Sequence, residues 1–229
     1  MRSGSTSTSA QTKQQTYSLI IVDDHPAVRR GMREIYSLVP EFNVVAEASS
    51  INQTLEQLAS HAVDLAIVDL GLGDESGLEL IKRLRKQYPK VKVLVASMHD
   101  DHMFSERAIR VGAGGYVNKS APEEELIKAA RTVLAGRLYL HPQVAADVLV
   151  RSVNSGRDAY RSPVDQLSDR ELEVFRLVGQ GKTTRQIAEE LELSPKTVDT
   201  HREHIKSKLD IANTNELVHQ ATVWWLERV

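Results

Sequence analysis

The strongest constraint on the fold is a regular alternation of short apolar runs with amphipathic segments of helical length. Between residues 17 and 138 this strand-then-helix pattern occurs five times. Several of the apolar runs are continuous, which is typical of strands covered on both faces of a sheet. The pattern predicts an α/β domain with a doubly wound, five-stranded parallel sheet. The predicted strands contain Leu19–Val22, Val44–Ala48, Leu65–Leu70, Val91–Ala96 and Tyr116–Val117, and the predicted helices lie near Ala27–Leu38, Ile51–Ala59, Leu78–Tyr88, Phe104–Val111 and Pro122–Leu134.

The rest of the chain divides into three segments. Residues 1–16 are mostly Ser, Thr and Gln, with little apolar surface to bury, and predict a disordered leader. Residues 139–164 follow the α/β domain of residues 17–138 and are predicted to be a linker, because residues 151–163 are polar and contain Gly and Pro. Residues 165–229 predict a smaller all-α domain of four helices. Each of these helices opens with a capping pattern, namely Ser168 with Glu171, Thr183 with Gln186, Ser194 with Pro195, and Asn213 with Glu216.

Composition excludes several kinds of function. The 229 residues include no cysteine, which excludes a disulfide scaffold, a thiol nucleophile and a thiolate metal site. No apolar stretch approaches the ~20 residues of a membrane-spanning helix, and the first residues lack the apolar core of a secretory signal. A soluble cytoplasmic protein with no membrane association is therefore expected. The net charge of −2 comes without a basic tail, so charge alone does not predict nucleic-acid binding.

Charged side chains follow the predicted strands at their carboxyl ends, where parallel sheets bind ligands. Asp23 and Asp24 follow the first strand, and Asp69 follows the third. Three neighbouring carboxylates favour a bound cation, and an all-oxygen set suits Mg²⁺. Ser97 and Lys119 end the fourth and fifth strands, so the set predicts a pocket in which a carboxylate attacks a phosphoryl group. Taken singly, each of these residues could instead be a helix cap, a turn hydroxyl or a surface lysine.

The C-terminal segment carries the spacing of a helix-turn-helix. The motif consists of Leu167-Ser168-x-Arg170-Glu171-x-Glu173-Val174, then Gly181, Ile187-Ala188 and Leu191, then Ser194, Thr197-Val198, His201, Ile205 and Lys208-Leu209. On the helix predicted from Pro195 to Leu209, Val198, Ile205 and Leu209 share the face that must pack inward. The opposite face is free to enter a major groove and carries Lys196, Asp199, Thr200, Glu203 and Ser207. The candidates for phosphate contacts are Lys182, Thr183, Thr184, Thr197, Arg202 and Lys206.

Residues 17–138 resemble a CheY-like receiver domain, and residues 165–229 resemble a LuxR/FixJ-type helix-turn-helix domain. Together they resemble a two-component response regulator of the NarL/FixJ family. The spacing Tyr116-x-x-Lys119 and the Gly77 turn after Asp69 agree with this resemblance.

The resemblance implies a role for each residue at the strand ends. Asp69 would be phosphorylated, and Lys119 would pair with a phosphoryl oxygen. Ser97 would bind the phosphoryl group, with Tyr116 as its paired switch aromatic. The Mg²⁺ cofactor would be held by Asp24, Asp69 and the backbone carbonyl of Gly71, with Asp23 supporting it mainly through water.

Two departures from the family pattern affect loops. Ser120 follows Lys119 where many receivers have a cis-proline, so either a strained cis bond or a locally different loop is expected. Gly71 and Gly73 make the loop after Asp69 looser than in receivers with bulkier residues there. His25, His99 and His102 could also suggest a transition-metal site, although polar residues are normal in such loops.

The helical domain also departs from its family. Members often carry lysines where Asp199 and Glu203 stand, and carboxylates can accept a hydrogen bond from cytosine N4, so cytosine contacts are predicted at one or two positions. The last helix carries an apolar stripe that must partly close the domain core and would partly form the contact of a homodimer on double-stranded DNA. That stripe contains Leu217, Ala221, Trp224 and Trp225.

These features predict a phosphorylation-gated transcription factor rather than an enzyme. A sensor histidine kinase would donate the phosphoryl group to Asp69, and Ser97 and Tyr116 would then shift an equilibrium toward a DNA-competent dimer. One alternative is a haloacid-dehalogenase-like phosphatase, which would need a second Asp at position 71, where Gly71 stands. Another is a protein-docking module, favoured slightly by nine basic and twelve acidic residues in 165–229.

Overall fold

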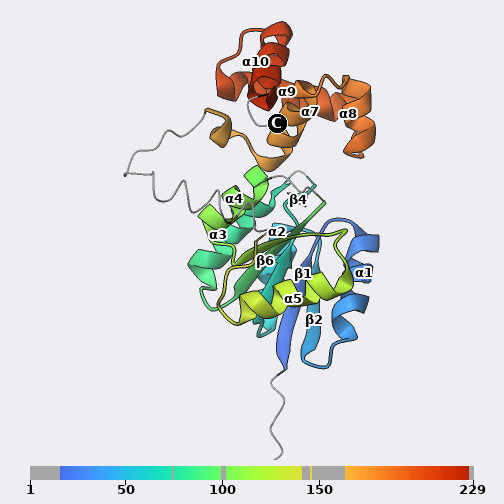
Figure 1. The fold of residues 1–229 in the computed structure, drawn as a ribbon, viewed down its shortest axis with the longest axis vertical. Coiled ribbons are helices and arrows are strands. Elements are labelled where there is room, and N and C mark those ends of the chain that lie inside the picture. The colour runs from blue at the N-terminus through green and yellow to red at the C-terminus, as the bar shows by residue number, and fades with distance from the viewer. Residues whose placement is uncertain (1–15, 74, 99–101, 141–144, 146–162, 227–229) are drawn as a thin grey trace, which may run out of the picture.

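The computed structural model describes residues 16–73, 75–98, 102–140, 145 and 163–226. The predicted leader and most of the predicted linker therefore lie outside the described residues. The described chain forms two domains, an α/β domain and a helical domain, which stand one above the other in Figure 1. Across the described ranges, none of the helices combines the length and the apolar character that a bilayer crossing requires.

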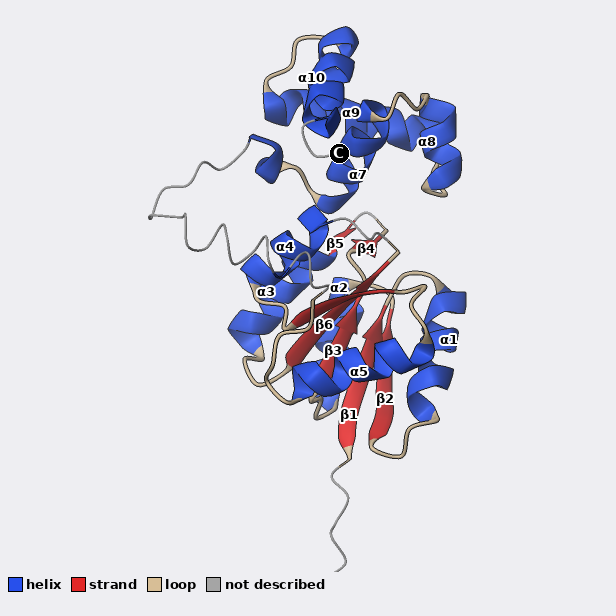
Figure 2. Ribbon diagram, in the orientation of Figure 1, coloured by secondary structure: helices blue, strands red, loops and turns tan. Residues whose placement is uncertain are grey.

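The first domain is built on a five-stranded parallel sheet with the strand order β2-β1-β3-β6-β7. Figure 2 shows helices on both faces of this sheet. The predicted fold class and number of strands are confirmed. The strands are β1 (Tyr17–Val22), β2 (Phe42–Ala48), β3 (Leu65–Val68), β6 (Lys92–Ser97) and β7 (Gly115–Asn118). The helices are α1 (Pro26–Ser37), α2 (Ile51–Ser60), α3 (Gly77–Gln87), α4 (His102–Val111) and α5 (Glu123–Leu134).

The two apolar layers explain why the strands read as continuous apolar runs. In β1, Leu19 and Ile21 pack with Tyr36 of α1 and Leu126 of α5. The alternate β1 residue Ile20 belongs to the other layer, which contains residues of α2, α3 and α4. Because successive side chains of a strand point to opposite faces, the four buried positions of β1, Leu19 to Val22, must all be apolar to exclude water from both layers.

A short hairpin after β3 was not predicted. Strands β4 (Gly71–Leu72) and β5 (Glu75–Ser76) pair antiparallel, with Gly71 opposite Ser76. Two-residue strands are too short to leave a periodic pattern in the sequence. The hairpin lies on the side of the sheet nearest the helical domain in Figure 1. In the chain, the hairpin connects the carboxyl end of β3 to the beginning of α3.

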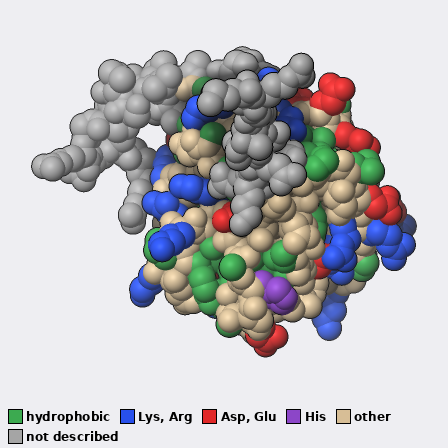
Figure 3. All heavy atoms as spheres, turned by 90° about the horizontal axis from the view of Figure 1, so that it is seen from below, with side chains coloured by type: hydrophobic (Ala, Val, Ile, Leu, Met, Phe, Trp, Pro, Cys, Tyr) green, Lys and Arg blue, Asp and Glu red, His purple; other side chains and the backbone are tan. Residues whose placement is uncertain are grey.

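The opposite end of the α/β domain carries both signs of charge. Figure 3 views the molecule from below and shows acidic and basic side chains around the rim of this face. A surface of mixed charge gives no electrostatic reason to place nucleic acid there.

The second domain contains the four predicted helices, preceded by the 3₁₀ helix η1 (Pro163–Gln166). They are α7 (Asp169–Gly179), α8 (Thr184–Glu190), α9 (Pro195–Leu209) and α10 (Thr214–Leu226). Ser168 and Thr183 both form complete capping boxes, and Ser194 caps α9 by accepting a hydrogen bond from the Thr197 amide. The predicted inward face of α9 is confirmed, since Val198 and Ile205 are fully buried.

Glycine at position 77 is required by the close packing of the chain after β3. A Cβ atom on Gly77 would lie 2.2 Å from the Asp69 carbonyl oxygen and 2.7 Å from the Leu70 Cα. Both neighbours are backbone atoms, so the clash cannot be relieved by a rotamer change. Gly31 in α1 offers a matched control, because a Cβ atom added there would meet nothing within 4 Å.

We expect Gly77→Ala to lower the free energy of unfolding by about 1–3 kcal/mol, as overpacked sites do. Gly31→Ala should instead raise it by about 0.5–1 kcal/mol, because it replaces a glycine within a helix. Urea denaturation of both variants measures the difference. Equal stability of Gly77→Ala and the parent protein would contradict the packing argument.

Candidate functional site

Lys119 bridges two buried carboxylates at the carboxyl ends of the strands. Its Nζ lies 2.6 Å from Asp23 Oδ2 and 2.6 Å from Asp69 Oδ2. Asp23 follows β1, Asp69 follows β3 and Lys119 follows β7, and the parallel register brings these three strand ends to one edge. The side chains of Asp23 and Lys119 are only 1% and 5% exposed. The bridge is therefore a strong interaction in a poorly solvated place.

The electrostatic environment of Asp69 disfavours its ionised form. Burial raises the pKa of Asp69 to about 6. The Lys119 ammonium group opposes this shift, whereas the neighbouring carboxylates of Asp23 and Asp24 add to it. One lysine thus does not fully compensate three carboxylates, and further positive charge at the site would favour ionised Asp69.

The remaining polar groups fit a divalent cation. Ligand atoms of Asp23, Asp24, His25 and Asp69 all lie within 4.8 Å of one another. Asp24 is held in place because its Oδ2 accepts a hydrogen bond from the Gly73 amide at 2.9 Å, and its Oδ1 lies 2.7 Å from His25 Nδ1. Carboxylate oxygens combined with an uncompensated negative charge are the conditions that Mg²⁺ prefers.

The carboxylates lie beside a cavity of about 360 Å³. Gly71 lines this cavity, as the predicted role of its backbone carbonyl requires. Ser97 lines it as well and is 1% exposed, and its carbonyl accepts a hydrogen bond from the Lys119 amide. The helical domain also contributes to the lining, through Arg170, Glu173, Glu190, Leu191 and Glu192.

The loop after Lys119 has a local structure of its own. The described residues contain no cis peptide bond, and Ser120 donates from its amide and its hydroxyl to Asn118 Oδ1. Of the two expected outcomes for this loop, the structure therefore shows the locally different loop. Tyr116 in β7 is buried within the apolar layer that contains α4.

Comparison with protein families identifies both domains. Residues 19–131 match the response regulator receiver domain, and residues 165–221 match the luxR family of bacterial regulatory proteins. The oxygen regulatory protein NreC of Staphylococcus carnosus is 36% identical over 89% of this chain and 95% of its own length. The transcriptional regulatory protein DegU of Brevibacillus brevis is 32% identical over 91% of this chain and 94% of its own.

The chain is a response regulator of the LuxR family. It is a transcriptional regulator rather than an enzyme, so the phosphatase alternative is rejected. A solved structure of RcsB dimers bound to DNA is 25% identical, with a TM-score of 0.54, and covers 94% of this response regulator and 100% of that chain.

The predicted DNA-reading face of the response regulator is exposed. On α9, Lys196, Asp199, Thr200 and Glu203 are all exposed, as the helical pattern predicts. Several residues that were predicted to contact DNA instead pair with other side chains of the same domain. Glu203 pairs with Lys206 at 2.8 Å, and Lys182 pairs with Glu190. The hydroxyl of Thr184 accepts from Arg202 at 2.7 Å and donates to Asp199 at 3.3 Å.

The beginning of α9 faces the receiver domain. A cavity of about 460 Å³ is lined by Glu75 and Ser76 of the receiver and by Lys196, Thr197 and Thr200 of α9. DNA that used these three residues would meet the β4–β5 hairpin. The receiver domain therefore lies next to the beginning of α9, while the rest of its predicted reading face is exposed.

Three of the four residues predicted for the dimer contact lie in the domain core. Leu217 and Ala221 are fully buried, and Trp224 is 7% exposed with its ring 5.4 Å from that of Phe175. These side chains cannot contact another chain without unpacking α10 from α7. Only the predicted Trp225 is partly exposed, and Val218, Val223 and Leu226 provide the exposed apolar surface of α10.

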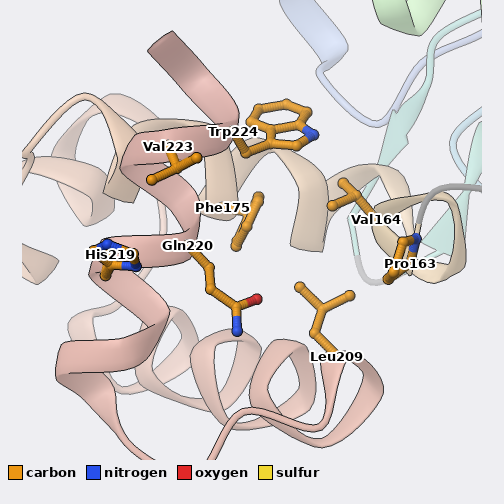
Figure 4. Close-up of a pocket in the computed structure, with 8 residues that line it drawn as sticks. All are labelled: Pro163, Val164, Phe175, Leu209, His219, Gln220, Val223 and Trp224. Atoms are coloured by element: carbon orange, nitrogen blue, oxygen red, sulfur yellow. The ribbon is translucent and has the colours of Figure 1, made fainter. Parts of the chain in front are cut away.

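An apolar pocket of about 260 Å³ opens beside this surface. Figure 4 shows Phe175, Trp224 and Leu209 around it, together with Val223, which directly precedes Trp224 in α10. A dimer contact through α10 would therefore use Val223 and the rim of this pocket.

The residues that join the two domains were not predicted from the sequence. Ser76, Arg107 and Asp169 meet at the domain interface, but they belong to three distant segments with no shared motif. His25 was considered as a metal ligand, and the structure places it beside Asp24, whereas His99 lies outside the described residues.

Neutralising Asp69 should stabilise the fold when no metal is bound. Because the pKa of Asp69 is raised from 3.8 to about 6, ionising it costs more in the folded than in the unfolded chain. This penalty is complete above the folded pKa and fades as the pH falls toward the unfolded pKa. Asp69→Asn should therefore raise the free energy of unfolding by about 1–3 kcal/mol near neutral pH in metal-free buffer.

Urea denaturation at neutral pH and at about pH 4.5 measures the effect, which should shrink at the lower pH. Glu56→Gln, at an exposed position of α2, serves as the control and should change little at either pH. A gain for Asp69→Asn that is independent of pH would contradict the assignment of the penalty to this carboxylate.

Proposed function

We propose that phosphorylation of Asp69 switches this response regulator and that the phosphorylated form binds promoter DNA as a homodimer. The observation that carries the proposal is the position of the Lys119 ammonium group, 2.6 Å from both Asp69 and Asp23, beside a cavity that Ser97 also lines. A carboxylate nucleophile, a cation and a hydroxyl are thereby present at one small site.

The chemistry follows from these groups. A carboxylate oxygen of Asp69 attacks the phosphorus of phosphohistidine on a sensor histidine kinase. The phosphorus–nitrogen bond breaks, and the imidazole leaves and takes up a proton. Lys119 neutralises charge on the transferred group, and the Ser97 hydroxyl donates a hydrogen bond to it.

Asp24, Asp69 and the carbonyl of Gly71 would hold Mg²⁺, with Asp23 supporting it through water. The ion supplies positive charge that shields the incoming phosphoryl oxygens. Asp23 is already committed to Lys119 and accepts a hydrogen bond from the His25 amide at 2.9 Å, which supports an indirect role.

Ser97 and Tyr116 then transmit the change. Ser97 ends β6 and Tyr116 lies in the neighbouring β7, where Val95 pairs with Tyr116 and Ser97 with Asn118. A shift of the Ser97 hydroxyl toward the phosphoryl group would leave space that the Tyr116 ring can enter. Rearrangement at this edge biases the equilibrium toward the DNA-competent dimer.

The helical domain reads double-stranded DNA through α9, and the protein acts in the cytoplasm. The exposed face of α9 supports this role, as do the DNA-bound dimers of the similar protein RcsB. In the dimer, α9 lies in the major groove, with Asp199 and Glu203 at base edges and Lys196 and Thr200 beside them. Phosphate contacts come from Lys182, Thr183, Thr184, Thr197, Arg202 and Lys206.

Acetyl phosphate with Mg²⁺ should add one phosphoryl group at Asp69 and increase the affinity for promoter DNA by about tenfold. Asp69→Ala should show neither effect, and chelation of the metal should abolish labelling of the parent protein. Mass spectrometry and DNA-binding titrations measure the two outcomes. Failure to find the modified Asp69 despite an active donor would refute the proposal.

Base preference provides a separate test of α9. Asp199→Ala or Glu203→Ala should each relax a preference for cytosine, by about 1–3 kcal/mol for a good base contact. Lys206→Ala is the matched variant on the same helix, at a position proposed to contact phosphate. It should weaken binding to all sequences and reduce the slope of affinity against salt by about one. Unchanged base preference of both acidic variants in a binding selection would contradict the predicted cytosine contacts.

A further inference from the structure

A carboxylate from the DNA-binding domain is buried in the receiver domain. Asp169, the first residue of α7, is 2% exposed. It accepts a hydrogen bond from the Ser76 hydroxyl at 2.6 Å. The backbone amide of Leu78, in the first turn of α3, favours the ionised form of Asp169. Asp169 of the other domain is therefore placed beside the N-terminus of α3, whose first amides have no partner within the helix.

Arg107 of α4 completes this contact. Its Nη2 donates to the Leu167 carbonyl at 2.6 Å, and its Nη1 lies 3.8 Å from Asp169 Oδ1. The Arg107 side chain is 14% exposed, so the pair is largely removed from water. Burial raises the pKa of Asp169, while Ser76 and Arg107 favour its ionised form. Loss of Arg107 would leave a buried carboxylate without its counter-charge, and domain separation would relieve that cost.

The docked domain covers the phosphorylation site. Arg170 and Glu173 of α7, together with Glu190, Leu191 and Glu192, line the cavity over Asp69. On the far side of this cavity, Glu192 Oε2 lies 3.7 Å from His25 Nε2. Asp69 itself is only 8% exposed. The rim around the acceptor carboxylate is therefore already occupied by another part of the same chain.

This arrangement distinguishes donors by size. The cavity of about 360 Å³ lies within the range of small-molecule sites, which hold about 300–1,000 Å³. A protein donor has to lay roughly 800 Å² of its own surface around the site to form a standard interface. The DNA-binding domain occupies the surface on which such a donor would dock.

We propose that the DNA-binding domain, held by Asp169 and Arg107, closes Asp69 to protein phosphodonors while leaving it open to small acyl phosphates. This inference rests on the proposed phosphorylation of Asp69. With an acyl phosphate, an Asp69 oxygen bonds to phosphorus while the phosphorus–oxygen bond of the donor breaks, and a carboxylate leaves. With phosphohistidine, the same oxygen attacks only after the domains separate.

The test compares two donors on the full chain. Arg107→Ala removes the contact, and Arg110→Ala is the matched control on the same helix, since Arg110 pairs with Glu106 of α4. The small donor is acetyl phosphate with Mg²⁺. The protein donor is an autophosphorylated sensor histidine kinase whose phosphohistidine labels the Arg107→Ala variant. Small-angle scattering reports whether the domains have separated.

We expect the protein donor to phosphorylate Arg107→Ala about tenfold faster than the parent chain, with an increased radius of gyration. Acetyl phosphate should label both at the same rate, and Arg110→Ala should behave as the parent chain with both donors. Ser76→Ala removes the hydroxyl that donates to Asp169, leaves the buried carboxylate less compensated, and should repeat the effect of Arg107→Ala if that variant folds poorly.

Equal rates from the protein donor for parent and variant would overturn the inference. An equal acceleration with both donors would also overturn it, because the contact would then act on the chemistry at Asp69 rather than on access. Labelling by acetyl phosphate with no difference between the chains for the protein donor would refute only this inference. Absence of labelling by either donor would refute the proposed function as well.

Discussion

The balance of charge around Lys119 is the constraint on which the functional site depends. Three strands deliver carboxylates and an ammonium group to one edge of the sheet, and that single ammonium group lies between Asp23 and Asp69. Burial raises the pKa of Asp69, and the single ammonium group only partly opposes this shift, so the site is short of positive charge. The same imbalance that penalises the metal-free site favours binding of a cation and then of a phosphoryl group that the cation shields. The expected affinity for a cation and the cost of ionising Asp69 without one thus have the same cause, the shortage of positive charge at the site.

The chain between Asp69 and α3 gives this site a physical route to the DNA-binding domain. The Gly77 amide donates to the Leu70 carbonyl, and Gly77 packs so closely on Asp69 that a side chain has no room. The residue before Gly77 is Ser76, whose hydroxyl is bonded to Asp169 of the other domain. Any movement of the segment after Asp69 in the proposed switch would therefore reach the domain interface through a short stretch of chain. No long pathway through the core is needed to couple the two domains.

The DNA-binding domain combines local and tertiary sources of stability. Capping boxes at Ser168 and Thr183 fix where α7 and α8 begin, and the buried face of α9 packs on α7 and α8. The opposite face of α9 carries carboxylates as well as basic groups, and several of them pair with one another. Such pairs keep the reading face ordered and limit the general attraction to phosphate that an unpaired basic face would have. In the proposed complex, specific base contacts would then account for more of the discrimination between DNA sequences.

Local signals in the chain were enough to predict the fold class, the helix starts of the second domain and the set of residues at the strand ends. Apolar periodicity, capping residues and the position of Asp23, Asp69 and Lys119 after apolar runs are all local, and the parallel sheet converts them into one site. The β4–β5 hairpin, the core position of Trp224 and the contact of Asp169 with Ser76 and Arg107 became visible only in the folded chain. A strand of two residues is too short to show an alternating apolar pattern. An apolar stripe on a helix does not distinguish residues that face the domain core from residues that face a partner. A contact between domains depends on how two finished surfaces fit, and no local pattern in the chain records that fit.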